Sequence, residues 1–133
     1  AVHPGVVADL IREAGLHAGS RVLDVGCGTG NYVRALQEAT GCAISGVEPS
    51  DQMRQRAGSA ASWTALVAGA AETLPFREGS FDLVYSTDVI HHVGDRDAYF
   101  SEAARVCSAN TRVASSSAAA SRRAVSAASF QWT

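Results

Sequence analysis

The chain has 133 residues, 47% of them hydrophobic and 18% charged, and its net charge is −2 at pH 7. This length and composition allow one domain with a hydrophobic core and exclude an intrinsically disordered chain. The first hundred residues contain no basic cluster, so a nucleic-acid-binding surface is not expected. Three cysteines without a C-x-x-C pair, no signal peptide and no long apolar run favour a cytoplasmic protein without a membrane span.

Hydrophobic periodicity predicts helices and strands that alternate along the chain. The helical segments carry apolar residues at helical spacing and are bounded by capping residues, and the strands are short apolar runs. We expect helices over residues 4–14, 31–40, 51–57 and 95–106, and strands over residues 21–25, 43–47, 63–68 and 81–86. This alternation predicts an α/β fold with a mostly parallel sheet and right-handed crossovers.

Composition changes after Cys107. Residues 108–129 are largely Ser and Ala, with little periodicity, so no fifth strand is predicted there. We therefore divide the chain into a core over residues 1–107 and a Ser/Ala-rich tail over residues 108–133. The tail is either a native low-complexity segment or non-native sequence, and its composition is typical of disorder.

A glycine loop follows the first strand, in the run VLDVGCGTG that ends at Gly30. Glycine lets the backbone approach a ligand closely, and the free amides of such a loop suit a carboxylate or phosphate. The dinucleotide fingerprint G-x-G-x-x-G needs glycine at its sixth place, where this chain has Asn31. The alternative is an ordinary strand–helix turn. The predicted ligand-contacting loop residues are Gly26, Cys27, Gly28 and Gly30.

Two acids flank this loop in the predicted sheet. Asp24 lies on an otherwise apolar strand, where a buried carboxylate is costly unless it meets a positive group or hydrogen-bond donors. Glu48 ends the second strand, where an acid can accept both hydroxyls of a ribose. The alternatives are that Asp24 only fixes loop amides and that Glu48 is a surface acid.

Four consecutive motifs resemble those of class I S-adenosylmethionine (SAM)-dependent methyltransferases, in their small-molecule branch. They are the glycine loop after Leu23-Asp24, the acid Glu48, the run GAAETLPF from Gly69, and the run FDLVYSTDVIHHV from Phe81. The resemblance covers about residues 15 to 106. It implies a Rossmann-like three-layer sandwich whose sheet usually has seven strands. Only about four are evident here, so the resemblance implies a sheet truncated or frameshifted after the fourth strand.

The resemblance also implies SAM as the cofactor and methyl transfer to a small-molecule acceptor. It places Asp24 beside the methionyl end of SAM and Glu48 at the ribose. The family often has an acid where this chain has Ala70, which leaves the adenine to neighbouring residues. The further cofactor-binding residues that it implies are Pro49, Met53, Ala71, Glu72, Ser86 and Thr87.

Two histidines follow the fourth strand. His91 and His92 are candidate catalytic residues, because a histidine can accept a proton from a hydroxyl acceptor. The structural alternative is that one histidine packs and the other is solvated. A metal site formed by both histidines and Asp95 is a weak pattern, and we expect no metal.

Three questions stay open. The chain could instead be a catalytically defective SAM-binding fragment, or a nucleotide-binding oxidoreductase fragment, against which Asn31 argues. A frameshift in the gene would also explain the tail. If its serines are encoded by TCN codons, a reading frame shifted by one nucleotide contains NTC codons at the junctions between neighbouring tail residues, and NTC encodes only Leu, Ile, Val or Phe. The shifted frame would then encode the missing apolar fifth strand. The acceptor and the oligomeric state do not follow from the sequence.

Overall fold

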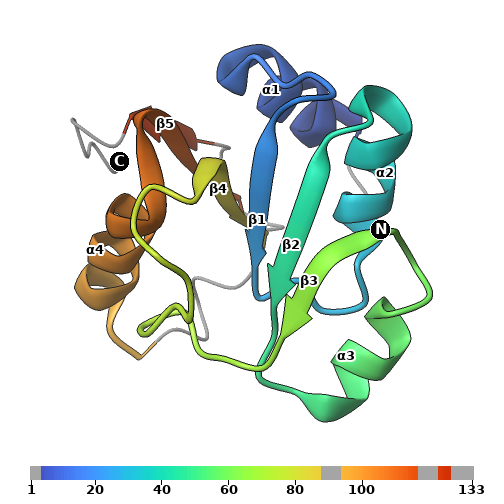
Figure 1. Cartoon of the computed structure of the whole chain (residues 1–133), viewed down its shortest axis with the longest axis vertical. Coiled ribbons are helices and arrows are strands. Elements are labelled where there is room, and N and C mark those ends of the chain that lie inside the picture. The colour runs from blue at the N-terminus through green and yellow to red at the C-terminus, as the bar shows by residue number, and fades with distance from the viewer. Residues whose placement is uncertain (1–3, 88–93, 117–122, 127–133) are drawn as a thin grey trace.

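The structure is a computed structural model that describes residues 4–87, 94–116 and 123–126 (Figure 1). The helices are α1 (Pro4–Ala14), α2 (Asn31–Thr40), α3 (Asp51–Ala57) and α4 (Arg96–Val106). The strands are β1 (Arg21–Val25), β2 (Ala43–Val47), β3 (Trp63–Val67), β4 (Phe81–Thr87), β5 (Cys107–Ser116) and β6 (Arg123–Ser126). The elements predicted up to residue 106 are confirmed within one residue at each end.

The described strands form one sheet in the order β3-β2-β1-β4-β5-β6. Strands β1 to β5 pair in parallel, and β6 is antiparallel to β5. From β1 the chain builds outward through β2 and β3, and it then returns to the other side of β1 as β4. Ligands of open α/β sheets bind at such a reversal, beyond the carboxyl ends of the strands. This general rule predicts that a ligand would bind beyond β1 and β4.

Helices cover both faces of the sheet, with α1 and α2 on one face and α4 on the other (Figure 1). Side chains alternate between the two faces along a strand, so Val22 packs under α1 and α2 whereas Leu23 packs under α4. These two cores confirm the three-layer, Rossmann-like α/β sandwich. None of the helices in the described part of the chain is long and apolar enough to cross a membrane.

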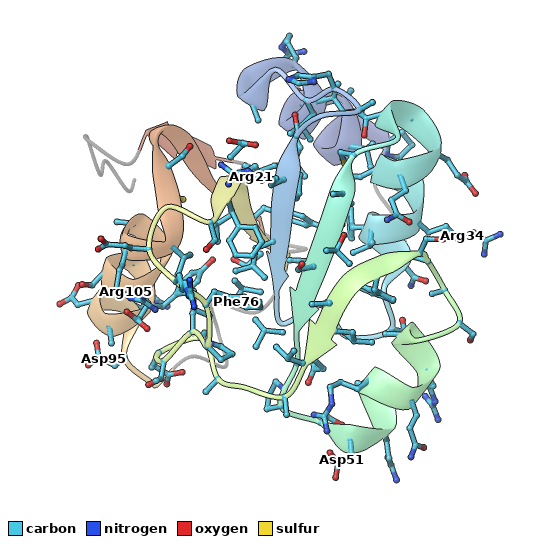
Figure 2. The ribbon with its side chains drawn as sticks, in the orientation of Figure 1. Arg21, Arg34, Asp51, Phe76, Asp95 and Arg105 are labelled. Atoms are coloured by element: carbon cyan, nitrogen blue, oxygen red, sulfur yellow. The ribbon has the colours of Figure 1, made fainter. Side chains whose placement is uncertain are left out.

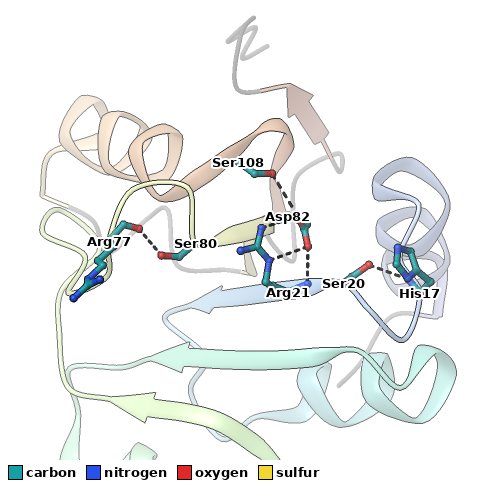
Figure 3. A network of polar contacts seen from close by, with 7 residues as sticks. All are labelled: His17, Ser20, Arg21, Arg77, Ser80, Asp82 and Ser108. Atoms are coloured by element: carbon teal, nitrogen blue, oxygen red, sulfur yellow. Dashed lines mark hydrogen bonds and ion pairs between the residues drawn. The ribbon is translucent and has the colours of Figure 1, made fainter.

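A polar network joins β1 and β4 at their amino ends, which lie opposite the expected ligand site (Figure 3). The Arg21 backbone N–H donates to Asp82 Oδ2 at 2.9 Å, and its guanidinium donates to both carboxylate oxygens. The Ser108 hydroxyl, at the start of β5, donates to Asp82 Oδ1 at 3.4 Å. The guanidinium of Arg21 lowers the pKa of Asp82 by hydrogen bonding. Asp82 thus joins the first residues of three adjacent strands.

The prediction of about four strands, with none after Cys107, was wrong. β5 pairs with β4 from Phe81 to Thr87, so β4 lies inside the sheet and not at its edge. Sheet pairing uses backbone N–H and C=O groups, which Ser and Ala supply as well as any residue. Apolar periodicity detects side-chain burial and therefore misses such a strand. The boundary between core and tail after residue 107, and the origin of the tail, remain predictions.

We predict that Val113→Pro destabilises the protein by about 2 kcal/mol or more, because Val113 lies between Val84 and Val125 and proline cannot donate to a sheet ladder. Ala109→Pro is the matched control. Ala109 lies within β5 where the register jumps from the Phe81 pair to the Leu83 pair, and proline is tolerated at such irregularities. Urea unfolding measures both variants. Equal losses would argue that β5 is not a paired strand.

Candidate functional site

The glycine loop, residues 26–30, leaves the carboxyl end of β1 at the topological reversal. Gly26, Gly28 and Gly30 all have positive φ angles, of 68°, 56° and 83°. Gly30 caps the N-terminus of α2, and a Cβ atom there would lie 3.0 Å from the ring of Trp63. A Cβ atom on Gly28 would meet nothing within 4 Å. The loop is therefore packed at its end and faces open space at its centre.

Glu48, which directly follows β2, is buried with 8% of its surface exposed. Its Oε1 accepts a hydrogen bond from the Gly28 N–H at 3.0 Å, and its Oε2 accepts one from the Ser50 N–H at 2.8 Å. Arg54 donates from Nη1 to the backbone carbonyl of Glu48 at 2.7 Å. Each carboxylate oxygen has two acceptor sites, so Glu48 fixes the loop and keeps capacity for further donors. This geometry excludes the alternative of a surface acid.

Asp24 is also buried, with 1% of its surface exposed. Its Oδ2 accepts a hydrogen bond from the Tyr85 hydroxyl at 2.7 Å, whereas its Oδ1 has no hydrogen-bond partner among the described residues. Burial raises the pKa of Asp24 to about 7, the Tyr85 hydrogen bond opposes this rise, and the Glu48 charge adds to it. Burial thus brings the pKa of Asp24 close to neutral pH, and one of its buried oxygens has no partner among the described residues.

Cys27 lies between these two acids in the loop. Burial raises the pKa of its thiol to about 12, and the charges of Asp24 and Glu48 act in the same direction. The thiol therefore stays protonated at neutral pH, which makes it a packing residue rather than a nucleophile. Its Sγ lies 3.1 Å from where a Cβ atom on Gly46 would be.

The residues assigned to the adenine lie on two segments beyond β2 and β3. Met53, on α3, is 40% exposed, and Pro49 is also exposed. Ala71 is partly buried against the core, and Glu72 Oε2 accepts a hydrogen bond from the Gly94 N–H at 3.1 Å. The Glu72 carboxylate thus links this segment to the residues just before α4.

Two charged residues of α4 fix the segment that follows Glu72. Arg105 donates to the carbonyls of Phe76 and Leu74 at 2.8 and 2.9 Å, and Glu102 Oε1 accepts from the Leu74 N–H at 2.8 Å (Figure 2). Our sequence analysis missed this clamp. The i, i+3 spacing of an acid and a base at the end of a helix was visible, but their backbone partners lie about thirty residues away in sequence.

Ser86 and Thr87 end β4 at the same edge of the sheet as the glycine loop. Ser86 is 1% exposed, and its hydroxyl accepts a hydrogen bond from the Tyr99 hydroxyl at 2.9 Å. His91 and His92 lie outside the described residues, so their catalytic role remains a prediction. The metal alternative, which needs both histidines, also lies outside the described residues.

The structure brings Asp24, Gly28 and Glu48 together beyond neighbouring strands. Our sequence analysis missed Tyr85, the one described hydrogen-bond partner of the Asp24 carboxylate. The two residues are paired in the register of β1 and β4. A buried acid needs a donor, and Tyr85 offers one on the neighbouring strand, but only the register between β1 and β4 could have shown that they meet.

A comparison of the sequence with family models identifies the family of this chain. Residues 23–114, which are more than half of the chain, match the model of the methyltransferase domain family. The chain belongs to this methyltransferase family. The match begins on β1 and extends into β5, so it includes the glycine loop, both acids and β4.

Individual relatives agree with this membership. Sterol 24-C-methyltransferase of Schizosaccharomyces pombe is 35% identical over 103 residues, which are 73% of this chain and 27% of that protein. A 27-O-demethylrifamycin SV methyltransferase of Amycolatopsis mediterranei is 31% identical over 74% of this chain and 39% of its own length. The crystal structure of the YcgJ protein of Bacillus subtilis superposes with a TM-score of 0.76 at 29% identity, over 85% of this chain and 50% of that one. The chain thus spans half or less of the length of each of these three proteins.

We predict that Asp24→Asn stabilises the ligand-free protein more at pH 8 than at pH 5. The folded-state pKa of Asp24, about 7, lies above the ordinary value of about 3.9, so ionisation of Asp24 removes stability as pH rises through about 7. Asparagine lacks this penalty. Melting temperatures at both pH values measure the difference, which we expect to be on the order of 5 °C.

Asp82→Asn is the control for this prediction. The pKa of Asp82 is lowered by Arg21, so its carboxylate contributes stability above the ordinary aspartate pKa, and its replacement should lower the melting temperature at both pH values. A gain for Asp24→Asn that is equal at pH 5 and pH 8 would contradict the raised pKa.

Proposed function

We propose that this methyltransferase-family domain binds SAM beyond β1, β2 and β4 and supports methyl transfer to a small-molecule acceptor. The observation that carries the proposal is the pair of buried carboxylates beside a glycine loop whose centre faces open space. SAM offers a ribose diol and two cationic groups, the sulfonium and the α-ammonium. Glu48 keeps acceptor capacity for hydroxyls, and Asp24 Oδ1 has no partner among the described residues, so the residues present fit this cofactor.

The other residues are assigned by their positions. In this proposal Glu48 accepts the ribose hydroxyls, and Asp24 lies at the methionyl end. The exposed side chain of Met53 supplies an apolar face for the adenine. Ala71 and Glu72 border the adenine on the other segment, which the Glu72 carboxylate links to Gly94. The remaining proposed contacts are Gly26, Cys27, Gly28, Gly30, Pro49, Ser86 and Thr87.

Bound SAM supplies a methyl group on a positively charged sulfur, which a nucleophilic acceptor takes in a single in-line displacement. The protein would contribute mainly by positioning the two reactants, and no covalent nucleophile is needed. A general base is needed only for an acceptor that must lose a proton, and His91 and His92 are the candidates. The names of the two curated relatives specify methylation at a carbon and at an oxygen, which supports a small-molecule acceptor without fixing the methylated atom.

The second candidate is a SAM-binding domain without turnover. Binding of SAM without methyl transfer to any tested acceptor would support it. Binding of NAD in preference to SAM would instead revive the oxidoreductase alternative, which the family match disfavours.

We predict that Gly28→Ala weakens SAM binding at least tenfold in a calorimetric titration, because its methyl group would enter the open space above the loop. Gly79→Ala is the matched control. Gly79 has a φ of 68° and also nothing within 4 Å of a built Cβ, so both variants carry similar backbone strain. The melting temperatures of the two variants should therefore fall alike. Equal SAM affinity in both variants would place the cofactor elsewhere.

We predict that His91→Ala and His92→Ala each leave the SAM dissociation constant within about twofold of the parent value, because neither histidine belongs to the proposed cofactor contacts. With a hydroxyl acceptor, loss of a general base lowers turnover by roughly 10²-fold or more. Paired binding and turnover assays separate the two effects. A variant that loses SAM binding would show that its histidine contacts the cofactor.

A further inference from the structure

The Asp24 carboxylate is an acceptor that the described residues leave half satisfied. Oδ2 is held by Tyr85, and Oδ1 has no hydrogen-bond partner among the described residues, although less than 1 Å² of it is exposed. The arginine ion pairs of the described residues do not include Asp24. The titratable groups that face it are Tyr85 on β4, Glu48 after β2, Cys27 in the loop and Tyr99 on α4. Among the described residues, the groups that face Asp24 are therefore tyrosine, cysteine and glutamate side chains.

A buried carboxylate in such surroundings has two ways to lower its free energy. It can bind a proton and become neutral, or it can pair with a cation from a ligand. The two are mutually exclusive at one oxygen, so the proton and the cation compete. Glu48 differs from Asp24, because each of its carboxylate oxygens already accepts a hydrogen bond from a backbone N–H.

We propose that Asp24 gives up a proton when the cationic amino-acid end of the cofactor binds, and that Tyr85 is a positioning residue that holds Oδ2 and leaves Oδ1 for the cation. The proton passes to the buffer, and no other bond changes. This inference rests on the proposed function, because it takes SAM as the ligand. It adds to that function a proton linkage and a role for Tyr85.

The proton linkage sets the direction of the pH dependence. Asp24 is protonated below a pKa of about 7, so SAM affinity should fall about tenfold for each pH unit below that value and level off above it. Binding should therefore release protons, and more of them per bound SAM below pH 7 than above it. The Tyr85 hydrogen bond favours the charged form, so its loss should move the affinity profile to higher pH.

The test is calorimetric titration with SAM between pH 5.5 and 7.5, in buffers of different ionisation enthalpy, which reports released protons directly. In this range an α-ammonium, with a pKa of about 7.7–8.0, stays largely charged. 5′-Methylthioadenosine is the reference ligand, because it keeps the adenosine but has neither the ammonium nor the sulfonium charge. We expect its affinity to be independent of pH and its binding to release no proton.

Two tyrosine variants separate positioning from general stability. Tyr85→Phe should shift the SAM affinity profile to higher pH and should leave methylthioadenosine binding unchanged. Tyr99→Phe is the matched control: it also removes a buried hydroxyl, but that hydroxyl donates to Ser86 rather than to Asp24, so the profile should not move. Asp24→Asn should abolish both the proton release and the pH dependence.

The outcomes distinguish the inference from the function on which it rests. SAM affinity that is independent of pH, with no proton released, overturns the inference while the cofactor site stands. A profile that Tyr85→Phe and Tyr99→Phe shift equally overturns the role of Tyr85. Failure of both SAM and methylthioadenosine to bind overturns the proposed function, and the proton linkage with it.

Discussion

The interaction on which the site depends is the contact of the Glu48 carboxylate with the backbone of the glycine loop. One carboxylate oxygen holds the Gly28 N–H, and the other holds the Ser50 N–H at the start of α3. Hydrogen bonds to a charged group contribute about 1.5–3 kcal/mol each, more than neutral ones. A single side chain thus couples the loop after β1 to the helix after β2.

Asp24 and Glu48 are both acids and are almost equally buried, yet their surroundings differ. Two backbone N–H groups donate to Glu48, whereas among the described residues Asp24 accepts one hydrogen bond, from a hydroxyl, and its Oδ1 has no partner. A buried group left unsatisfied costs about 1–3 kcal/mol. The protein can avoid much of that cost by keeping Asp24 protonated, and this explains how an acid with only one described hydrogen-bond partner persists within a packed sheet.

How far the sequence predicts this molecule depends on how local each signal is. Apolar periodicity and caps such as Ser50 and Asp95 are local, and the elements that they predict up to residue 106 are confirmed. β5 and β6 pair through their backbones, which periodicity does not detect. The acids and glycines of the site are visible because they adjoin strand ends. Tyr85 and Arg105 are not, because their partners come from register and packing between distant segments.

The position of β4 therefore decides whether the site is formed. Arg21 and Asp82 hold β4 to β1 at their amino ends, and Tyr85 and Asp24 hold the same two strands at their carboxyl ends. Backbone pairing between the strands runs from Val22 to Asp24, in the interval between these two contacts. None of these contacts uses a side chain of residues 109–116. The tail contributes backbone pairing to the far side of β4, so changes in the tail side chains should alter the stability of the sheet more than the placement of Asp24, Gly28 and Glu48.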